Sequence, residues 1–174
     1  EILFRTKLSE NLFKGLSPWM QKLPGGLIHV NVVGCALFAA ISGSSAATVA
    51  TVGKMSIPEL RKRNYPEKIL LGSLAGSGTL GLLIPPSIIL IIYGVAVQES
   101  IAKLFIAGII PGIMIALIFM SYVIIWSLIN KKSMPKIIEE YSFLEKIKRS
   151  KQLLPVIILI LAVIGSIYTG IATA

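Results

Sequence analysis

Long stretches without a charged residue alternate with short charged ones along the 174-residue chain. Asp, Glu, Lys and Arg are absent from residues 23–53, 69–98, 104–130 and 152–174. Each of these stretches exceeds the roughly 20 residues that a helix needs to cross the hydrocarbon core of a bilayer. The pattern therefore predicts an all-α membrane protein. Its predicted transmembrane helices are 69–97, 104–130 and 152–174.

Residues 1–26 show an amphipathic pattern instead. Apolar residues recur every three or four positions from Phe4 to Leu23, with charged residues between them, which is the spacing of a helix. Ser17 followed by Pro18 predicts that a second helix starts there, because serine is a favourable N-cap and proline fits the first helical position. We expect these helices to lie at the membrane interface. The alternative is packing against another subunit.

A second amphipathic segment is expected within residues 131–151. Ile137, Tyr141, Leu144 and Ile147 share one face of a helix, and charged residues occupy the other faces. Such a helix either lies flat on the membrane or presents its charged side to solvent as an ordinary loop helix.

The net charge of +9 is confined to the predicted loops. Residues 1–26 carry +2, residues 54–68 carry +3 and residues 131–151 carry +4. Basic residues grouped in this way belong to loops between membrane segments, so nucleic acid is excluded as a partner and membrane lipid is expected as one. The positive-inside rule places 61–68 and 131–151 in the cytoplasm. The turn at 98–103 has no net charge and is placed on the periplasmic side.

The segment 27–60 has cytoplasmic charge on both sides, so it must cross the membrane an even number of times or not at all. Residues 27–57 would form about 46 Å of helix, which is too short for two full spans. We therefore predict a re-entrant hairpin that enters and leaves on the cytoplasmic side. One bent or broken span is the alternative.

The middle of this segment is rich in small polar residues. Ser42, Gly43, Ser44 and Ser45 follow one another within an apolar run. Irregular backbone at membrane depth is tolerated only where protein or a water-filled cavity surrounds it. The four residues are therefore a candidate ion or ligand site. Close helix packing, which small residues also permit in bilayers, is the alternative.

The predicted helix 69–97 contains a second interruption. Glycines and serines between Gly72 and Gly81 precede the pair Pro85 and Pro86. Each proline lacks an N–H and Pro86 disfavours the helical conformation of Pro85, so the helix must break and leave carbonyl groups unpaired. Such oxygens suit a hard cation such as Na⁺. A simple proline kink is the alternative. Two interrupted segments together are typical of the binding site of a secondary transporter.

Catalytic and transition-metal chemistry has little support in the sequence. His29 is the one histidine and Cys35 the one cysteine, so neither a triad with an adjacent acid nor a metal site of several cysteines is expected. We interpret His29 as a core or interface residue.

Five runs of residues resemble the large membrane subunit of tripartite ATP-independent periplasmic (TRAP) transporters. They occur in the family's order and cover nearly the whole chain. The runs are Gly25–Val32, Leu37–Thr48, Ile57–Pro66, Gly78–Ser87 and Ile101–Gly112.

The resemblance implies a Na⁺-coupled elevator transporter that imports organic anions, such as C4-dicarboxylates or sialic acids, across the bacterial inner membrane. It implies two partners, a periplasmic substrate-binding protein and a small membrane subunit. The chain resembles most of the first of two inverted halves, and its start at Glu1 and end at Ala174 within an apolar segment also indicate part of a longer polypeptide. The second Na⁺ site and much of the substrate site are expected in the other half. Carried over by motif, one Na⁺ site would use Ser42, Gly43, Ser44, Ser45, Gly81, Ile84 and Pro86.

Three other functions compete with this one. A membrane-embedded enzyme needs acids, bases or metal ligands within the membrane, which this chain hardly offers. A structural subunit would use both interruptions for packing alone. An ion channel would not need a binding protein. Na⁺-dependent uptake into proteoliposomes distinguishes these possibilities.

Overall fold

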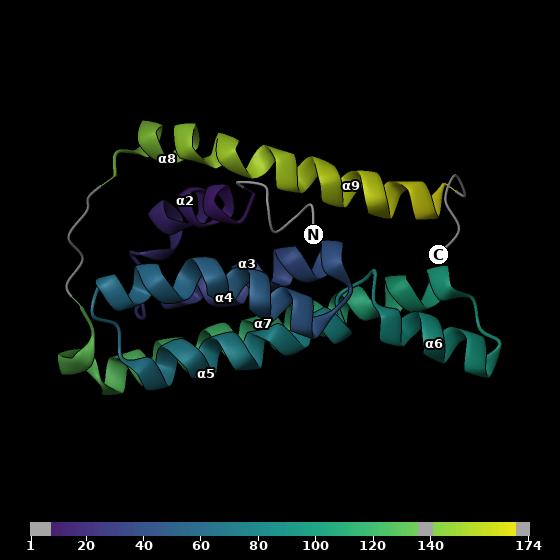
Figure 1. Cartoon of the computed structure of the whole chain (residues 1–174), viewed down its shortest axis with the longest axis horizontal. Helices are drawn as coiled ribbons and strands as arrows, with labels where there is room; N and C mark the ends of the chain where they lie inside the picture. Colours follow the sequence, from purple (N-terminus) through teal and green to yellow (C-terminus); the bar gives the residue numbers. More distant parts are fainter. Residues whose placement is uncertain (1–7, 136–140, 170–174) are drawn as a thin grey trace.

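The computed structural model describes residues 8–135 and 141–169, and in these ranges the chain forms helices and no strand (Figure 1). The described elements, in chain order, are α2 (Leu8–Met20), α3 (Ile28–Ser42), α4 (Ser45–Lys62), α5 (Glu67–Gly78), the 3₁₀ turn η1 (Thr79–Leu82), α6 (Ile88–Val97), α7 (Ile101–Ile129), η2 (Lys131–Ser133), α8 (Phe143–Ser150), η3 (Lys151–Leu153) and α9 (Leu154–Tyr168).

Helix α3 is the centre of the bundle. It contacts α2, α4, α5, α7 and α9, and ten of its fifteen residues are buried. Since α3 is apolar on all sides, it can be covered on every face by neighbouring helices. His29 lies in this interior, with Nε2 2.8 Å from the carbonyl oxygen of Pro24, and Cys35 is a buried free thiol. The interpretation of His29 as a core residue agrees with this position.

The segment 69–97, predicted as a transmembrane helix broken at its prolines, forms two helices with a gap between them. Helix α5 ends at Gly78, and α6 begins at Ile88. We call the residues between them, Thr79–Ser87, the break. The long helix α7 runs beside α5, η1 and α6 in turn, so it holds both halves of the interrupted segment (Figure 1).

The amphipathic N-terminal region differs from the prediction. Helix α2 continues through Ser17 and Pro18 to Met20, so no second helix starts there. Pro18 lies in the last turn of α2, and the Ser17 hydroxyl donates to the carbonyl oxygen of Phe13 at 2.6 Å instead of capping a new helix. The prediction of a helix boundary at Ser17 was wrong.

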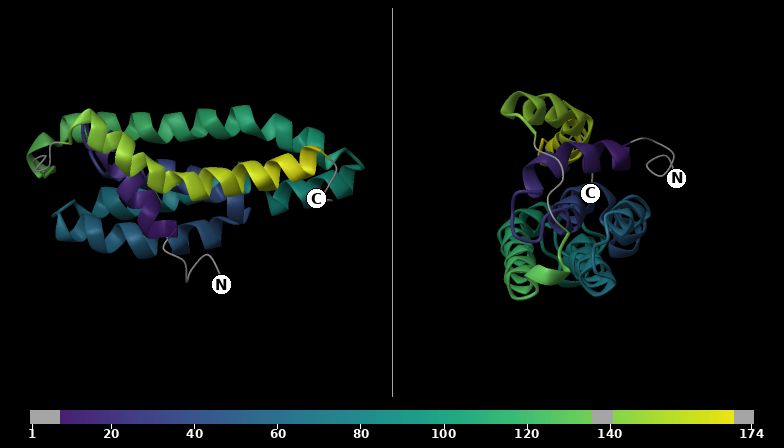
Figure 2. Two further views of the ribbon diagram at one scale, coloured as in Figure 1. Left: turned by 90° about the horizontal axis from the view of Figure 1, so that it is seen from above. Right: turned by 90° about the vertical axis from the view of Figure 1, so that its left-hand side faces the viewer.

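The apolar face of α2 is covered by the protein itself. Leu12, Phe13 and Leu16 are buried in the main hydrophobic cluster. Figure 2 shows α2 between α8 and α9 on one side and the other helices on the opposite side. Helices of the same chain therefore cover this face, and the placement of α2 at the membrane interface stays a prediction.

Helices α8 and α9 follow one line, joined by η3 (Figure 1). We call residues 143–168 the α8–α9 rod. Within the described residues, Phe143–Ile167 and Ile101–Ile129 are the two helices long and apolar enough to cross a membrane. Helix α8 continues into α9 through η3, and placement of the segment around Leu144 and Ile147 flat on the membrane stays a prediction. Ile137 lies outside the described residues.

Candidate functional site: the hairpin tip and the helix break

The chain reverses direction between α3 and α4. Gly43 adopts a left-handed conformation with φ +60°, and its N–H donates to the carbonyl oxygen of Ala39. Ser44 is extended and its hydroxyl accepts the N–H of Ala47 at 3.5 Å, which caps α4. Glycine ends one helix and serine starts the next, as their conformational preferences favour. We call Ser42–Ser45 the tip. The two helices form a hairpin; its re-entrance into a membrane stays a prediction.

The tip packs directly onto the break. The carbonyl oxygen of Gly43 accepts the N–H of Ile88 at 3.3 Å. A Cβ atom at Gly43 would lie 2.7 Å from the carbonyl oxygen of Pro86, and a Cβ at Gly81 would lie 2.8 Å from the backbone of Ser44 and Ser45. Glycine is therefore required at both positions by close backbone contact, and at Gly43 also by its positive φ.

Two hydroxyl groups meet at the tip. Ser42 Oγ lies 2.8 Å from Thr48 Oγ1 and 3.3 Å from the carbonyl oxygen of Ser44. Thr48 is fully buried. The sequence-based site did not include Thr48, although it closes the same Ser/Gly/Ala/Thr run. Only the reversal of the chain at Gly43 brings its side chain back to Ser42.

Ile84 occupies the other side of the break. Its backbone N–H donates to the carbonyl oxygen of Leu80 at 2.8 Å. A Cβ atom added at Gly112 of α7 would lie 2.9 Å from the Ile84 side chain. Gly108, one turn earlier on α7, lies close to the carbonyl oxygen of Leu83. The structure thus brings Gly81 and Pro86 to the tip, while the Ile84 side chain faces α7.

Helix dipoles provide the electrostatics of this region, because the sequence has no acidic residue, lysine or arginine in 23–53 or 69–98. The C-terminal end of α3 exposes partly negative carbonyl groups, whereas the N-terminal ends of α4 and α6 are partly positive. The carbonyl side suits a cation and the amide side an anion. In the described part of the chain, no group of three His, Cys, Asp or Glu residues could hold a metal ion.

An open hollow of about 390 Å³ adjoins the tip. Small side chains of α4 and α5 form its walls, and hydroxyl groups stand at Ser45 and Thr79. Its lining residues are Ser45, Ala46, Val49, Ala50, Ala75, Gly78 and Thr79. The hollow lies beside the N-terminal end of α4, so a negatively charged group placed there would meet a favourable dipole.

A buried polar seam fixes α3 against α5. Asn31 Nδ2 donates to the carbonyl oxygen of Leu70 at 3.2 Å and to Ser73 Oγ at 3.0 Å. Ser77 Oγ donates to the carbonyl oxygen of Ser73 at 2.5 Å and reaches that of Asn31 at 3.4 Å. This seam was not predicted from the sequence. Its signal was present, since Asn31 is the one amide side chain in the uncharged stretch 23–53 and Ser73 and Ser77 are one helical turn apart.

The whole chain, residues 1–174, matches the sequence family described as "Tripartite ATP-independent periplasmic transporter, DctM component". The chain belongs to this family. The resemblance found in the five sequence runs is therefore confirmed. Because the family consists of transporter permeases, the interpretation as a membrane-embedded enzyme does not hold.

Three relatives illustrate the range of named substrates in the family. A C4-dicarboxylate TRAP transporter large permease protein from Pseudomonas aeruginosa is 40% identical over 86% of this chain and 34% of its own length. A sialic acid TRAP transporter permease protein from Haemophilus influenzae is 42% identical over 66% of this chain and 18% of its own length. An ectoine/5-hydroxyectoine TRAP transporter large permease protein from Ruegeria pomeroyi is 34% identical over 98% of this chain and 39% of its own length.

This DctM-family chain spans about a third of the length of the C4-dicarboxylate permeases that it matches. The tip and the break both lie inside the matched region, since that region covers the whole chain. Family membership alone does not select a substrate, because the relatives are named for different ones.

Proposed function

We propose that this chain is part of a Na⁺-coupled secondary transporter that imports organic anions across the bacterial inner membrane. A periplasmic substrate-binding protein delivers the anion, and a small membrane subunit completes the transporter. The observation that carries the proposal is the packing of the tip on the break, which places two interrupted helices, far apart in the sequence, at one point. Paired interrupted helices are the sites at which secondary transporters bind ions and substrates.

Na⁺ is the coupling ion that fits this region best. The oxygens nearby belong to hydroxyl groups of Ser42 and Thr48 and to backbone carbonyl groups at the end of α3 and in the break. Hard cations take such ligands. A monovalent ion suits a site without carboxylates, because the second charge of a divalent ion would be buried with no negative group to compensate it. We assign Ser42–Ser45, Gly81, Ile84 and Pro86 to this Na⁺ site, with Ile84 contributing through its backbone.

The anion is expected at the partly positive N-terminal end of a helix, away from the carbonyl groups proposed for Na⁺. The hollow beside Ser45 lies at the positive end of α4, and a carboxylate is a chemical group suited to that position. We infer that this hollow forms one wall of the substrate site, and that a second, inverted half of the protein supplies the other wall. Movement of the hairpin and the break as one body would then carry ion and substrate together, as in an elevator mechanism.

Uptake into proteoliposomes tests this function. The complete transporter, with its small subunit and binding protein, is reconstituted and supplied with a labelled C4-dicarboxylate or sialic acid. Accumulation is expected only with an inward Na⁺ gradient and only with the binding protein present. Equal uptake with K⁺ replacing Na⁺ contradicts sodium coupling. Flux that ignores the binding protein indicates a channel, and no flux of either anion indicates a structural subunit or another substrate.

A further inference from the structure

The polar seam between α3 and α5 contains a buried oxygen that still needs a hydrogen bond. Oδ1 of Asn31 is fully buried and has no hydrogen-bond partner among the described residues. The nitrogen and oxygen of this amide cannot exchange places, because Nδ2 donates to the carbonyl oxygen of Leu70, which accepts and cannot donate. Oδ1 therefore lies on the other side of the amide and requires a donor from elsewhere.

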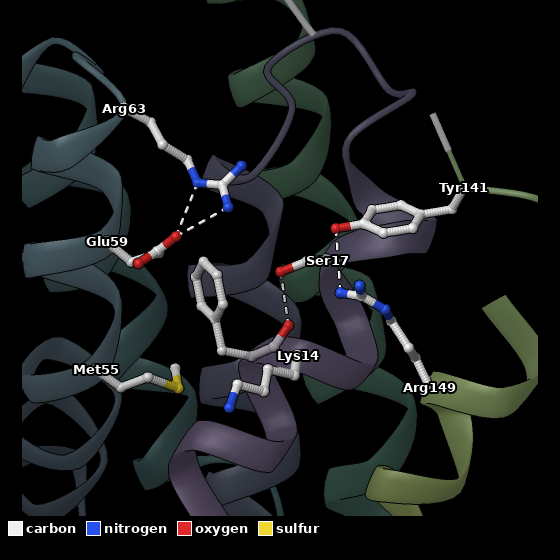
Figure 3. A pocket seen from close by; sticks show the side chains of 8 residues that line it. Lys14, Ser17, Met55, Glu59, Arg63, Tyr141 and Arg149 are labelled. Atoms are coloured by element: carbon white, nitrogen blue, oxygen red, sulfur yellow. Dashed lines mark hydrogen bonds and ion pairs between the residues drawn. The ribbon is translucent and has the colours of Figure 1, made fainter. Parts of the chain in front are cut away.

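Ser56 on α4 also carries a buried polar atom. Its side chain is fully buried, and its Oγ atom has no partner within the described part of the chain. Figure 3 shows its neighbours Met55 and Glu59 at a different place, the open pocket that α4 shares with α2 and α8. Ser56 does not line that pocket. A hydroxyl group can donate one hydrogen bond and accept others, so Ser56 can serve in either role.

Helix geometry places these two groups at one level of the bundle. One buried residue from each of α3, α4 and α5 belongs to the same hydrophobic cluster: Cys35, Val52 and Leu74. Asn31, Ser56 and Leu70 each lie four residues, or about one helical turn, further from the tip on the same three helices. The hydrogen bond from Asn31 to Leu70 agrees with this layer, and all three residues are fully buried.

A water molecule fits this layer better than a cation does. Asn31 Oδ1 and Ser56 Oγ are not bonded to each other, since each is without a partner. Apolar residues surround the layer, with the Cys35 cluster on one side and Leu27 and Leu60 on the other. Buried polar groups are normally bonded to protein or to ordered water, and a buried water typically has two to four polar partners. A hard cation needs several more oxygen ligands than these two.

We propose that one ordered water molecule bridges Asn31 Oδ1 and Ser56 Oγ. The water donates to Asn31 and shares a second hydrogen bond with Ser56, so α4 is joined to the polar seam between α3 and α5. The site lies twelve residues of α3 from Gly43, or about 18 Å of helix, and is distinct from the tip. The inference follows from burial and hydrogen bonding and does not depend on Na⁺ coupling or on the substrate. Its failure and the failure of the proposed function are therefore distinguishable.

An experimental density map of the complete transporter in lipid nanodiscs tests the position of the water. We expect a density peak within hydrogen-bond distance, roughly 2.5–3.2 Å, of both Asn31 Oδ1 and Ser56 Oγ. The map used is one that shows other buried waters, so that a missing peak is informative. Direct contact between the two oxygens, or no peak between them in such a map, overturns the proposal.

Thermal unfolding of two variants of the same complex tests the hydrogen bond to Ser56. Ser56→Ala removes the hydroxyl group with little change in shape and should lower the melting temperature by about 1–3 °C, because the bridge to Asn31 is lost. Thr51→Val is the matched control on α4. The Thr51 hydroxyl group is also buried without a partner among the described residues, but it lies at the level of Cys35 and Leu74, whose side chains contain no oxygen.

Removal of such a hydroxyl group should leave the melting temperature of Thr51→Val unchanged or raise it, because an unpaired buried polar group is lost. Ser56→Ala should therefore melt below both the wild type and Thr51→Val. Equal melting temperatures for the two variants would mean that the Ser56 hydroxyl group has no bond of its own, and would overturn the bridge.

Discussion

The carbonyl oxygen of Gly43 accepts a hydrogen bond from the backbone N–H of Ile88 at 3.3 Å. This bond joins the end of α3 to the start of α6, two points that are 45 residues apart in the sequence. Both groups are at helix ends and have no partner within their own helix. The tip and the break are therefore one structural unit, and a substitution in either is expected to affect the whole of the proposed Na⁺ site.

Gly81→Ala tests how closely that unit is packed. The added methyl group would lie 2.8 Å from the backbone of Ser44 and Ser45, which cannot move away as a flexible side chain could. We expect Na⁺-driven uptake to fall at least tenfold. Gly72→Ala on α5 is the matched control, because no atom lies within 4 Å of its added Cβ and alanine favours helix by about 0.5–1 kcal/mol. Equal uptake by the two variants would contradict tight contact at Gly81.

Removal of both prolines tests the origin of the break. In Pro85→Ala/Pro86→Ala, helix is free to extend toward Gly81, and the carbonyl groups of the break become paired within that helix. Uptake at limiting Na⁺ should fall, while the amount of assembled transporter in the membrane stays the same. Normal Na⁺-driven uptake would leave the prolines with a kinking role only.

The two interruptions were predictable because they depend on local chemistry. A glycine among serines and a pair of prolines act on their own backbone, so the sequence alone locates the interruptions near Gly43 and Pro85. Their contact was not predictable from the residues alone, since it depends on how α3, α5 and α7 pack. Thr48 and Ile84 show the same limit: the pattern identified the right region but not which side chains face the tip.

The two amphipathic segments show another limit of the sequence. An apolar stripe on a helix shows that one face is covered but not what covers it. Leu12 and Leu16 are covered by other helices of this chain, whereas Leu144 is exposed. A serine followed by a proline gives the same sequence signal at the start of a helix and in its last turn. Ser17 and Pro18 were therefore interpreted as a helix start although they lie in the last turn of α2.

Cysteine accessibility checks the predicted orientation. Lys62, Gln98 and Lys132 are exposed, and the native Cys35 is buried, so background labelling should be low. In intact cells, a membrane-impermeant maleimide should label Gln98→Cys, because its turn is placed in the periplasm. Lys62→Cys and Lys132→Cys should react only after the cells are opened. Labelling of Lys62→Cys and Gln98→Cys from the same side would overturn the topology.

Tyr65 connects the loop after α4 to the start of α3. Its hydroxyl oxygen accepts the N–H of Leu27 at 3.0 Å, and Tyr65→Phe should lower stability by about 1 kcal/mol near neutral pH. Burial raises the pKa of Tyr65, with smaller opposing effects from Leu27 and Arg63. The raised pKa means that the folded state favours the neutral form of the Tyr65 side chain. Its contribution is complete below the ordinary tyrosine pKa of about 10 and is lost as the pH rises through the raised value.

The difference in melting temperature between wild type and Tyr65→Phe should therefore shrink as the pH rises above about 10. Comparing the two proteins cancels the titration of the other tyrosines and of the lysines. A difference that stays constant over the alkaline range would mean that Tyr65 is not buried in the folded protein.

The hydroxyl pair at the tip gives the sharpest test of Na⁺ coordination. Thr48→Val keeps the shape of the side chain and removes its oxygen, whereas Thr48→Ser keeps the oxygen and removes a methyl group. If the Ser42–Thr48 pair binds the ion, the Na⁺ concentration for half-maximal uptake should rise roughly tenfold in Thr48→Val, since a hydrogen-bonding group facing a charge contributes about 1.5 kcal/mol or more. Thr48→Ser should stay near the wild type, and Ser42→Ala should resemble Thr48→Val.

Ser42→Ala and Thr48→Val keep every backbone carbonyl group, so they do not test whether those groups alone bind Na⁺. Gly43→Ala tests that case. A methyl group at Gly43 would lie 2.7 Å from the carbonyl oxygen of Pro86 and would also oppose the positive φ, so it distorts the tip whichever oxygen is used. Uptake is measured against Na⁺ for Ser42→Ala, Thr48→Val, Thr48→Ser and Gly43→Ala at matched expression. A Na⁺ dependence shifted in Gly43→Ala alone assigns coordination to the backbone. Four curves identical to the wild type would exclude the tip as the binding site of the coupling ion.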